Sequence, residues 1–490
     1  MTTLQQALHI FRKDARHLRL EIGGALLLTL ILVLSEVQTW ADLQEHGGDF
    51  SGGPMDVVLP LIWALLIARS IQTEALPGDR HFWLTRPYSR TGLVLAKAFF
   101  VAAFINLPLL IAQAAIVVID GLPLSSYLGG LLWNQVLITA LLVLPAAAIA
   151  ALTRNLAQFL PIAVIVGGML VGAATGPEFS IEDLNWVRSS IGFLVVVAVT
   201  SLAVWRQYRL RRSGNTALVA LGTAVAGLIF YLSFPQSAAF AIQSTVVGTA
   251  DSAFGLRLGE PRAIKSVATV TPNRYRQLLE LPVTVTGTDA QNLEVRVTGL
   301  AFKTLSGVTR KVRAKVEVSK LGLIHTANVD RDFFNAAKDS PVTVHAEYYV
   351  TQYADERSTD VPLDGTPVFI PGLGQCGAAV NYDNRSFVCR SAFRNPGWFV
   401  SDRLVMGPVV RRWWGVYSPF PADVVIHPVI ARSFELSKFD GGNELAPAAP
   451  EKPATLVSRK PVAYFRYTLD VPNVRLANYA IPEPKEESTN

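Results

Sequence analysis

The run YLGGLLWNQVLITALLVLPAAAIAALT, residues 127–153, contains no charged side chain. An α-helix needs about 20 residues to cross a hydrocarbon core about 30 Å thick, and this run is longer than that. The run therefore predicts a membrane-spanning helix.

The composition of the whole chain is that of a membrane protein. Half of its 490 residues are hydrophobic and only 17% are charged, with a mean hydropathy of +0.33, which is charge-poor for a soluble domain. The uncharged runs crowd into the first half, and the character of the sequence changes near residue 240. Seven runs are candidate spans, the second being the weakest because Asp56 and Arg69 shorten it: Ile22–Trp40, Met55–Thr73, Ala98–Ile119, Tyr127–Thr153, Asn155–Thr175, Asn185–Trp205 and Thr216–Phe234.

The positions of the basic residues predict an orientation. Short cytoplasmic links accumulate Lys and Arg. Such residues precede the first span and follow the second, fourth and sixth, as with Arg12, Arg154 and Arg209, whereas acidic residues such as Asp42 and Glu182 occupy the alternate links. We therefore expect a cytoplasmic N-terminus. An odd number of spans then places everything after about residue 240 outside.

Residues 1–20 have the pattern of an amphipathic helix. Basic side chains gather on one face, whereas apolar side chains recur at helical spacing on another: Leu4, Leu8, Phe11, Ala15 and Leu18. This pattern is typical of a helix that lies in the membrane surface and contacts lipid. The alternative is a cytoplasmic helix that packs on the rest of its own protein.

Beyond residue 240 the sequence alternates with period two. NLEVRVTGL from Asn292 and RKVRAKVEV from Arg310 place apolar residues at every second position, as half-buried antiparallel strands do. The predicted fold is thus a polytopic α-helical membrane bundle followed by an extracytoplasmic, all-β, sandwich-like domain. The expected division of the chain is 1–20 interfacial helix, 21–236 transmembrane domain, 237–480 outer β-rich domain and 481–490 polar tail.

Cys376 and Cys389 bracket an apolar, turn, apolar sequence that reads as a hairpin with one cysteine at each end. A location outside the cytoplasm permits a disulfide, and closing a loop of about 15 residues is worth about 3 kcal/mol in the chain-entropy model. Two free buried thiols are the alternative. A metal site is disfavoured because no second cysteine pair or suitably spaced histidine is present.

The chain contains none of the short motifs that carry catalysis or cofactor binding. It has no G-x-x-x-x-G-K-[ST] loop, no G-x-S-x-G and no H-E-x-x-H. We therefore expect no enzyme activity in this chain and no catalytic, cofactor-binding or metal-binding residue. The charge gives no case for nucleic-acid binding.

Polar residues inside the candidate spans are costly in hydrocarbon unless they are paired or face water. Asn106 and Gln113 share one face of the third span, and Asn134 and Gln135 lie within the fourth. These four residues are candidates for lining a substrate path. The alternative is that they hold helices together through interhelical hydrogen bonds.

The link LPGDRHFWLTRPYSR, residues 76–90, carries an unusual density of basic and aromatic residues on the predicted cytoplasmic side. Its aromatic residues could simply anchor the link at the headgroups. Alternatively, a short helix could insert into a groove on a cytoplasmic partner. The residues concerned are Arg80, Phe82, Trp83, Arg86 and Tyr88.

The N-terminal helix, the first two spans and the sequence LPGDRHFWLTRPYSRTGLVLAKAFF together resemble ABC-2 type transporter permeases, in particular permease-like bacterial membrane proteins with a GDR-x-FW-x-TRP loop. In that family an elbow helix precedes the spans, and the first cytoplasmic loop couples to a separate ATP-binding subunit. The resemblance covers about the first 235 residues. A seventh span and an outer β domain are departures from the family pattern.

The resemblance implies the membrane-spanning subunit of an ATP-driven ABC-type exporter in a bacterial inner membrane. It would work as a homo- or hetero-oligomer with an ATP-binding-cassette subunit. Two alternatives stay open. One is a non-transporting anchor or assembly protein whose outer domain binds a partner, and the other is a membrane-tethered extracytoplasmic enzyme.

Overall fold

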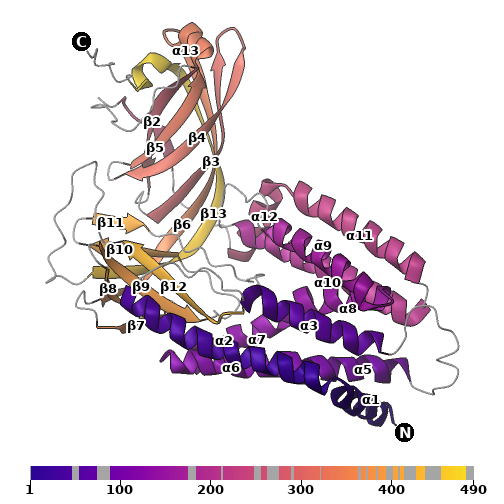
Figure 1. Ribbon diagram of the computed structural model, residues 1–490. Helices are drawn as coiled ribbons and strands as arrows, with labels where there is room; N and C mark the ends of the chain where they lie inside the picture. The colour runs from indigo at the N-terminus through magenta and orange to yellow at the C-terminus, as the bar shows by residue number, and fades with distance from the viewer. Residues whose placement is uncertain are drawn as a thin grey trace, which may run out of the picture. The chain divides into compact units, whose positions relative to one another are not determined.

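The computed structural model describes the chain in two compact units (Figure 1). Unit 1 comprises Met1–Glu178, Asn185–Phe234 and Ser358–Val457, and unit 2 comprises Phe179–Leu184, Pro235–Arg357 and Ser458–Asn490. The described residues are 2–46, 55–73, 89–174, 184–210, 213–247, 255–261, 275–287, 292–319, 322–361, 366–370, 374–381, 384–392, 401–406, 409–412, 426–435 and 454–481.

Long apolar helices dominate unit 1 and run side by side (Figure 1). They are α1 (Thr3–His17), α2 (Arg19–His46), α3 (Met55–Gln72), α5 (Arg90–Val101), α6 (Leu107–Ile119), α7 (Leu124–Ile138), α8 (Leu144–Leu152), α9 (Leu156–Ala174), α10 (Asn185–Leu210) and α11 (Ser213–Ser233). Two π-helical turns, η1 (Ala102–Asn106) and η2 (Thr139–Val143), join α5 to α6 and α7 to α8. Their core includes the buried Leu32, Trp63 and Phe100.

The prediction of seven spans is wrong for the part of the chain that the structure describes. Three helices are long and apolar enough to cross a membrane, namely Arg90–Ile119, Leu124–Leu152 and Trp186–Arg209, and the count rises to five if each of two bent helix pairs is one span. The remaining two candidates contain only the shorter apolar helices Val57–Gln72 and Leu156–Gly168.

The outer faces of these helices are apolar as well as their core. Leu27 is 57% exposed, and Leu221 and Ile229 are each 62% exposed. Water would disfavour so many exposed leucine and isoleucine side chains on adjacent turns, whereas hydrocarbon would not. The unit therefore has the surface of a membrane-associated helical bundle.

Helix α1 meets the next apolar helix at a sharp bend. Thr2 caps it through a capping box with Gln5, and the axis turns by 78° between Thr3–His17 and Arg19–Glu36. Ala7 and Ile10 pack on Leu93 and Ala96 of α5. Part of α1 therefore packs on its own protein, which is the alternative left open for this segment.

The predicted apolar face of α1 is divided between buried and exposed positions. Leu18 is fully buried, whereas Leu4 and Leu8 are 52% and 38% exposed. The exposed leucines are available to lipid. The interfacial role of residues 1–20 stays a prediction.

Unit 1 also contains a small antiparallel sheet. Its strands are β7 (Val368–Ile370), β8 (Gly374–Asn381), β9 (Asn384–Ala392) and β12 (Val429–Glu435), in the order β12-β9-β8-β7. A hairpin consists of β10 (Ser401–Met406) and β11 (Val409–Arg412), and both strands belong to the larger, nine-stranded sheet rather than to this small one. Cys376 and Cys389 lie opposite each other in β8 and β9 and form the predicted disulfide.

Unit 2 contains α12 (Gln236–Val247) and one large curved sheet (Figure 1). Its strands are β1 (Gly255–Leu258), β2 (Arg276–Thr286), β3 (Leu293–Thr304), β4 (Thr309–Ser319), β5 (Gly322–Asp330), β6 (Pro341–Val361) and β13 (Ala454–Arg475). The order is β1-β2-β5-β4-β3-β6-β13. The two strands predicted from period two lie in β3 and β4.

The predicted sandwich of two facing sheets does not describe unit 2, because all its described strands belong to one sheet. The apolar faces of these strands instead enclose a common core that includes Leu281, Phe302 and Val344. Phe334 of the short helix α13 (Arg331–Ala337) and Leu476 of the 3-10 turn η5 (Leu476–Tyr479) pack into the same core. The curvature of the sheet, together with α13 and η5, covers the apolar core that a second sheet would cover in a sandwich.

Candidate functional site

A buried polar network lies between two continuous helices, α5-η1-α6 and α7-η2-α8. It brings together all four polar residues that the sequence offered as candidates for a substrate path. Asn106 Nδ2 donates to Gln135 Oε1 at 3.3 Å and to Thr139 Oγ1 at 3.0 Å. Gln135 Nε2 and Asn134 Nδ2 donate to Gln113 Oε1 at 3.0 and 3.5 Å. Gln113 is fully buried. Four residues from two candidate spans therefore form one connected set.

The backbone around this network is shaped by two prolines. Asn106 ends η1 and Thr139 begins η2, and each π-helical turn is followed directly by a Leu-Pro pair at the start of the next helix. Proline has no N–H and clashes with the carbonyl four residues earlier, so a wider turn accommodates it. The hydrogen bond between Asn106 and Thr139 therefore links the two irregular turns.

The network continues to the small sheet of unit 1. Gln113 Nε2 donates to the carbonyl oxygen of Ile426 at 2.9 Å, and Ile426 precedes β12. Ala392 of β9 and Val429 of β12 pack into an apolar cluster with Ile116 and Tyr127. The segment around β9 and β12 is thus seated on α6 and α7 by both polar and apolar contacts.

Two contacts between charged side chains complete this seat. Glu36 Oε2 of α2 lies 2.5 Å from His427 Nδ1, and Asp120 Oδ1 lies 3.8 Å from a guanidinium nitrogen of Arg390. Burial raises the pKa of Asp120, the Arg390 charge acts in the opposite direction, and the nearby Glu36 raises this pKa further. Sequence reasoning missed these residues. The only signal was an acidic residue, Glu36, inside the first candidate span.

A second buried ion pair fastens α1 to its neighbours. Lys97 Nζ of α5 lies 2.6 Å from Asp14 Oδ2 and donates to the carbonyl oxygen of Ser70 in α3, also at 2.6 Å. Asp14 is 2% exposed and Lys97 8%. A buried charge requires a partner, and here each has the other. This pair joins three helices at one point.

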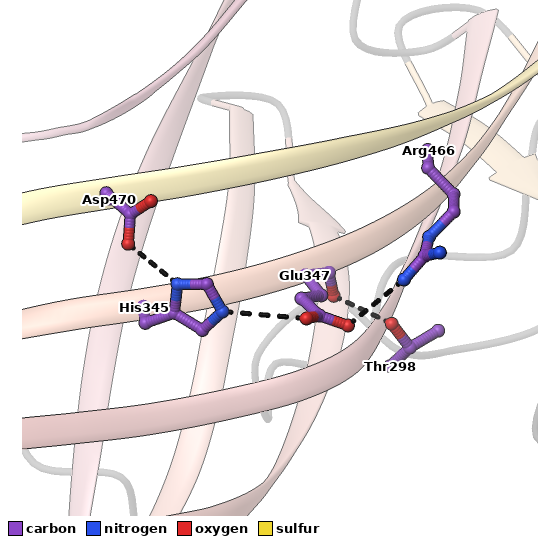
Figure 2. Close-up of polar contacts among 5 residues, drawn as sticks. All are labelled: Thr298, His345, Glu347, Arg466 and Asp470. Atoms are coloured by element: carbon purple, nitrogen blue, oxygen red, sulfur yellow. Dashed lines mark hydrogen bonds and ion pairs between the residues drawn. The ribbon is translucent and has the colours of Figure 1, made fainter. Parts of the chain in front are cut away.

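A third polar cluster lies on the outward face of the large sheet (Figure 2). His345 of β6 is placed between two carboxylates, with Nδ1 2.7 Å from Asp470 Oδ1 and Nε2 3.6 Å from Glu347 Oε1. Arg466 approaches Glu347 at 3.4 Å, and Thr298 Oγ1 donates to the Glu347 carbonyl oxygen at 3.2 Å. The hydrogen bond that His345 donates to Asp470, together with the nearby Glu347 carboxylate, raises the pKa of His345 despite some desolvation.

The residues in Figure 2 form a row of charged and polar side chains across the three strands β3, β6 and β13. Its imidazole nitrogens face different carboxylates, so the three groups do not converge on one point. Among the described residues, no group of three or more His, Cys, Asp or Glu side chains is arranged to hold a metal ion. The row suits recognition of a polar partner better than metal-dependent chemistry.

The predicted docking residues Arg80, Phe82, Trp83, Arg86 and Tyr88 lie outside the described residues. The link is described again from Ser89, whose N–H and hydroxyl both donate to Gln6 Oε1 of α1, at 3.2 and 2.9 Å. Comparison with protein-family models, with curated proteins and with solved structures finds no match to this chain.

Proposed function

We propose that this chain is the membrane-spanning subunit of an ATP-driven ABC-type exporter and works with a separate ATP-binding subunit. The sequence supports this through the resemblance of its first 235 residues to ABC-2 permeases, above all in the link at residues 76–90. The absence of a phosphate-binding loop means that ATP would be hydrolysed by the partner.

The observation that carries the proposal is the geometry of the N-terminus. An amphipathic helix with exposed leucines turns by 78° into a long apolar helix. A helix that lies in the membrane surface and then enters the bilayer requires such a turn of nearly a right angle. The same arrangement of an elbow helix before the first span belongs to the family that the sequence resembles.

The proposed setting is a bacterial inner membrane, with the N-terminus in the cytoplasm and the segment after residue 240 outside. Basic residues in alternate links support this orientation. In the same proposal, Asn106, Gln113, Asn134 and Gln135 line the substrate path in a conformation in which their mutual hydrogen bonds are exchanged for contacts with substrate.

Changing Trp83 and Arg86 together to alanine tests the proposed coupling. Aromatic and arginine residues at the centre of an interface each carry about 2 kcal/mol or more, so the double variant should recover the ATP-hydrolysing partner at a level reduced by about tenfold or more. The measurement is co-purification from the native membrane in mild detergent, with the amount of inserted protein determined alongside.

The matched control is the double variant Trp205→Ala and Arg209→Ala. Arg209 lies 4.9 Å from the Trp205 ring in α10. Like Trp83 and Arg86, these two residues lie at the basic end of a candidate span, where the predicted side is cytoplasmic. It should leave the partner bound. A wild-type chain that recovers no ATP-hydrolysing partner would contradict the exporter proposal.

A second candidate is a non-transporting anchor whose β domain binds a partner. The observation in its favour is that the intramembrane amides bond to one another and to backbone, as interhelical hydrogen bonds that hold a bundle together do. The anchor candidate expects the Trp83 and Arg86 variant to insert less well. It also expects Asn106→Ala to weaken the bundle without affecting transport.

A further inference from the structure

The turn between β3 and β4 presents two apolar side chains to solvent. Leu305 is 80% exposed and Val308 is 55% exposed, although turns are usually built from polar residues and glycine. Neither side chain belongs to the apolar core of unit 2. The packing of this unit therefore does not account for their apolar character.

Hydrogen bonds hold this turn in one shape. The Thr304 N–H donates to the Val308 carbonyl oxygen at 2.9 Å, and the Gly307 N–H donates to the Thr304 carbonyl oxygen at 3.0 Å. The Val308 N–H also donates to Thr304 Oγ1 at 3.2 Å. Gly307 has a φ of 85°, which glycine adopts without strain. Leu305 is thus presented at the apex of a well-defined hairpin.

The hairpin behind the turn is basic. Residues 297–316 contain five Lys or Arg side chains and no Asp or Glu. Arg310 forms an ion pair with Asp330. Lys303 and Lys311 are exposed and form no ion pair with the residues that the structure describes. Two lysines next to the turn are therefore available to an external anion.

Lys303 and Lys311 lie on the same face of the hairpin. Lys311 is opposite Ala301, and Ala301 and Lys303 are two residues apart, so strand alternation puts both lysines on one face. The carboxylates further along that face are those of Figure 2, and each already contacts a basic side chain. The end of the face next to the turn is thus positively charged.

The order of apolar apex and basic flank matches the depth profile of a lipid bilayer. Lys303 stands two residues behind Leu305, or about 7 Å along a strand. Segments at a membrane surface bury apolar groups about 5 to 10 Å deep, at the boundary between headgroups and acyl chains. With Leu305 at that depth, the lysines lie at the level of the lipid phosphates, where their flexible ammonium groups bind.

We propose that the turn at residues 304–309 binds the surface of an anionic lipid bilayer, with Leu305 and Val308 among the acyl chains and Lys303 and Lys311 against the phosphates. A protein partner fits this surface less well. A stable protein interface requires about 800 Å² from each partner, and a narrow turn with two apolar side chains does not offer an apolar surface of that size. The inference is independent of any ATP-hydrolysing partner.

Fluorescence quenching on the full chain in lipid nanodiscs tests the proposal. The two native cysteines are bonded to each other, so Ser306→Cys would provide the reactive thiol for a fluorophore within the turn. The quencher is a nitroxide on the acyl chains of phosphatidylcholine, used with or without about 30% phosphatidylglycerol. We expect strong quenching only when the lipid that carries the quencher is anionic. Quencher in the disc reports insertion into the chain's own bilayer, and quencher in added vesicles reports a second bilayer.

Substitutions separate the two contributions. Lys303→Gln and Lys311→Gln should each lower the ratio of lipid-bound to free turn by about fivefold, because each removes one charge near an anionic surface. Leu305→Ser should lower it by about tenfold or more, because the apolar apex is lost. Arg257→Gln is the matched control. Arg257 is exposed in β1, which pairs with the end of β2 that is remote from the turn, so quenching should stay at the wild-type level.

Equal quenching by neutral and anionic lipid, in discs and in vesicles alike, would overturn the proposal. So would unchanged quenching in Leu305→Ser. A fluorescence change that follows protein concentration instead of lipid charge would also overturn it, and would identify a second copy of the chain as the partner. If Leu305→Ser does not fold, as judged by size-exclusion chromatography, Val308→Ser decides the question.

Discussion

His325 illustrates how burial alone can make a single residue sensitive to pH. Its side chain lies in β5 at 1% exposure, with its ring 5.2 Å from the Tyr348 ring in an edge-on contact. Burial lowers the pKa of His325 to about 4, and the backbone of Leu281 acts in the opposite direction. The imidazole is therefore neutral over the whole physiological range.

We expect His325 to make unit 2 sensitive to acid. The unfolded chain takes up a proton near pH 6.5, whereas the folded one does so only near pH 4. Stability is therefore complete above about pH 6.5 and falls by about 3 kcal/mol as the pH drops to about 4. His325→Leu should remove most of this loss, as measured by pulse proteolysis in urea at several pH values.

His345 provides the control for this experiment because its shift has the opposite sign. Its pKa is raised by the hydrogen bond that it donates to Asp470 and by the nearby carboxylates, so any stability that it adds is present at low pH and is lost as the pH rises through the raised pKa. Because His345 is exposed, its contribution is small. His345→Gln should leave the acid-induced loss unchanged, and an unchanged loss in His325→Leu would contradict the prediction.

At the scale of helices and strands, buried polar contacts determine which elements are held together. The hydrogen bond between Asn106 and Thr139 joins two π-helical turns, and the ion pair between Lys97 and Asp14 joins α5 to α1. Apolar contacts between these helices do not specify a register, because leucine packs on leucine in many registers. Directional contacts select one register.

The contribution of the Lys97 pair can be measured by removing one or both charges. Lys97→Met leaves the buried Asp14 with only the more exposed Lys13, 3.9 Å away, as a counter-charge and should cost up to about 3 to 5 kcal/mol. The double variant Asp14→Asn with Lys97→Met leaves no buried charge and should cost much less. Both effects are measured by heating the protein in detergent and recording the temperature at which trypsin begins to cleave α1.

The exposed pair of Arg69 with Glu21 is the comparison for this measurement. The two side chains are 45% and 38% exposed at a distance of 3.2 Å, so Arg69→Met should cost about 1 kcal/mol or less. Equal losses for Lys97→Met and Arg69→Met would contradict the view that burial gives the Lys97 pair its importance.

At the scale of the whole molecule, the chain combines an apolar helical unit with a β-rich unit. Three helices, or up to five if bent pairs are counted as spans, are long and apolar enough to cross a membrane, and the orientation predicted from basic residues requires an odd number of spans. An odd number places the two ends of the helical region on opposite sides of a membrane.

Reporter fusions test this arrangement. A reporter fused after residue 86 should be active as a cytoplasmic fusion, and one fused after residue 260 should be active outside, because links rich in arginine stay inside. A cytoplasmic enzyme reporter and one that works only after export make the two outcomes distinguishable. The same location for both fusions would contradict the predicted orientation.

The sequence by itself determined the local features of this protein. The uncharged run at residues 127–153 coincides with the helix Leu124–Leu152, which passes the length and composition test for a span, and period-two patterns predicted strands that appear as β3 and β4. The spacing of Cys376 and Cys389 predicted a disulfide-linked hairpin, which is present. These features depend on residues that are near in sequence, so periodicity and spacing are sufficient to reveal them.

Only the tertiary structure decided how many helices are long enough to span, that the strands of unit 2 belong to one curved sheet, and which buried charges meet. Glu36 and His427 are 391 residues apart in the chain, and Asp120 meets Arg390 through a different pair of elements. Patterns within a short window carry no information about such pairs. Their energies arise from burial and proximity, which exist only once the helices and strands have packed.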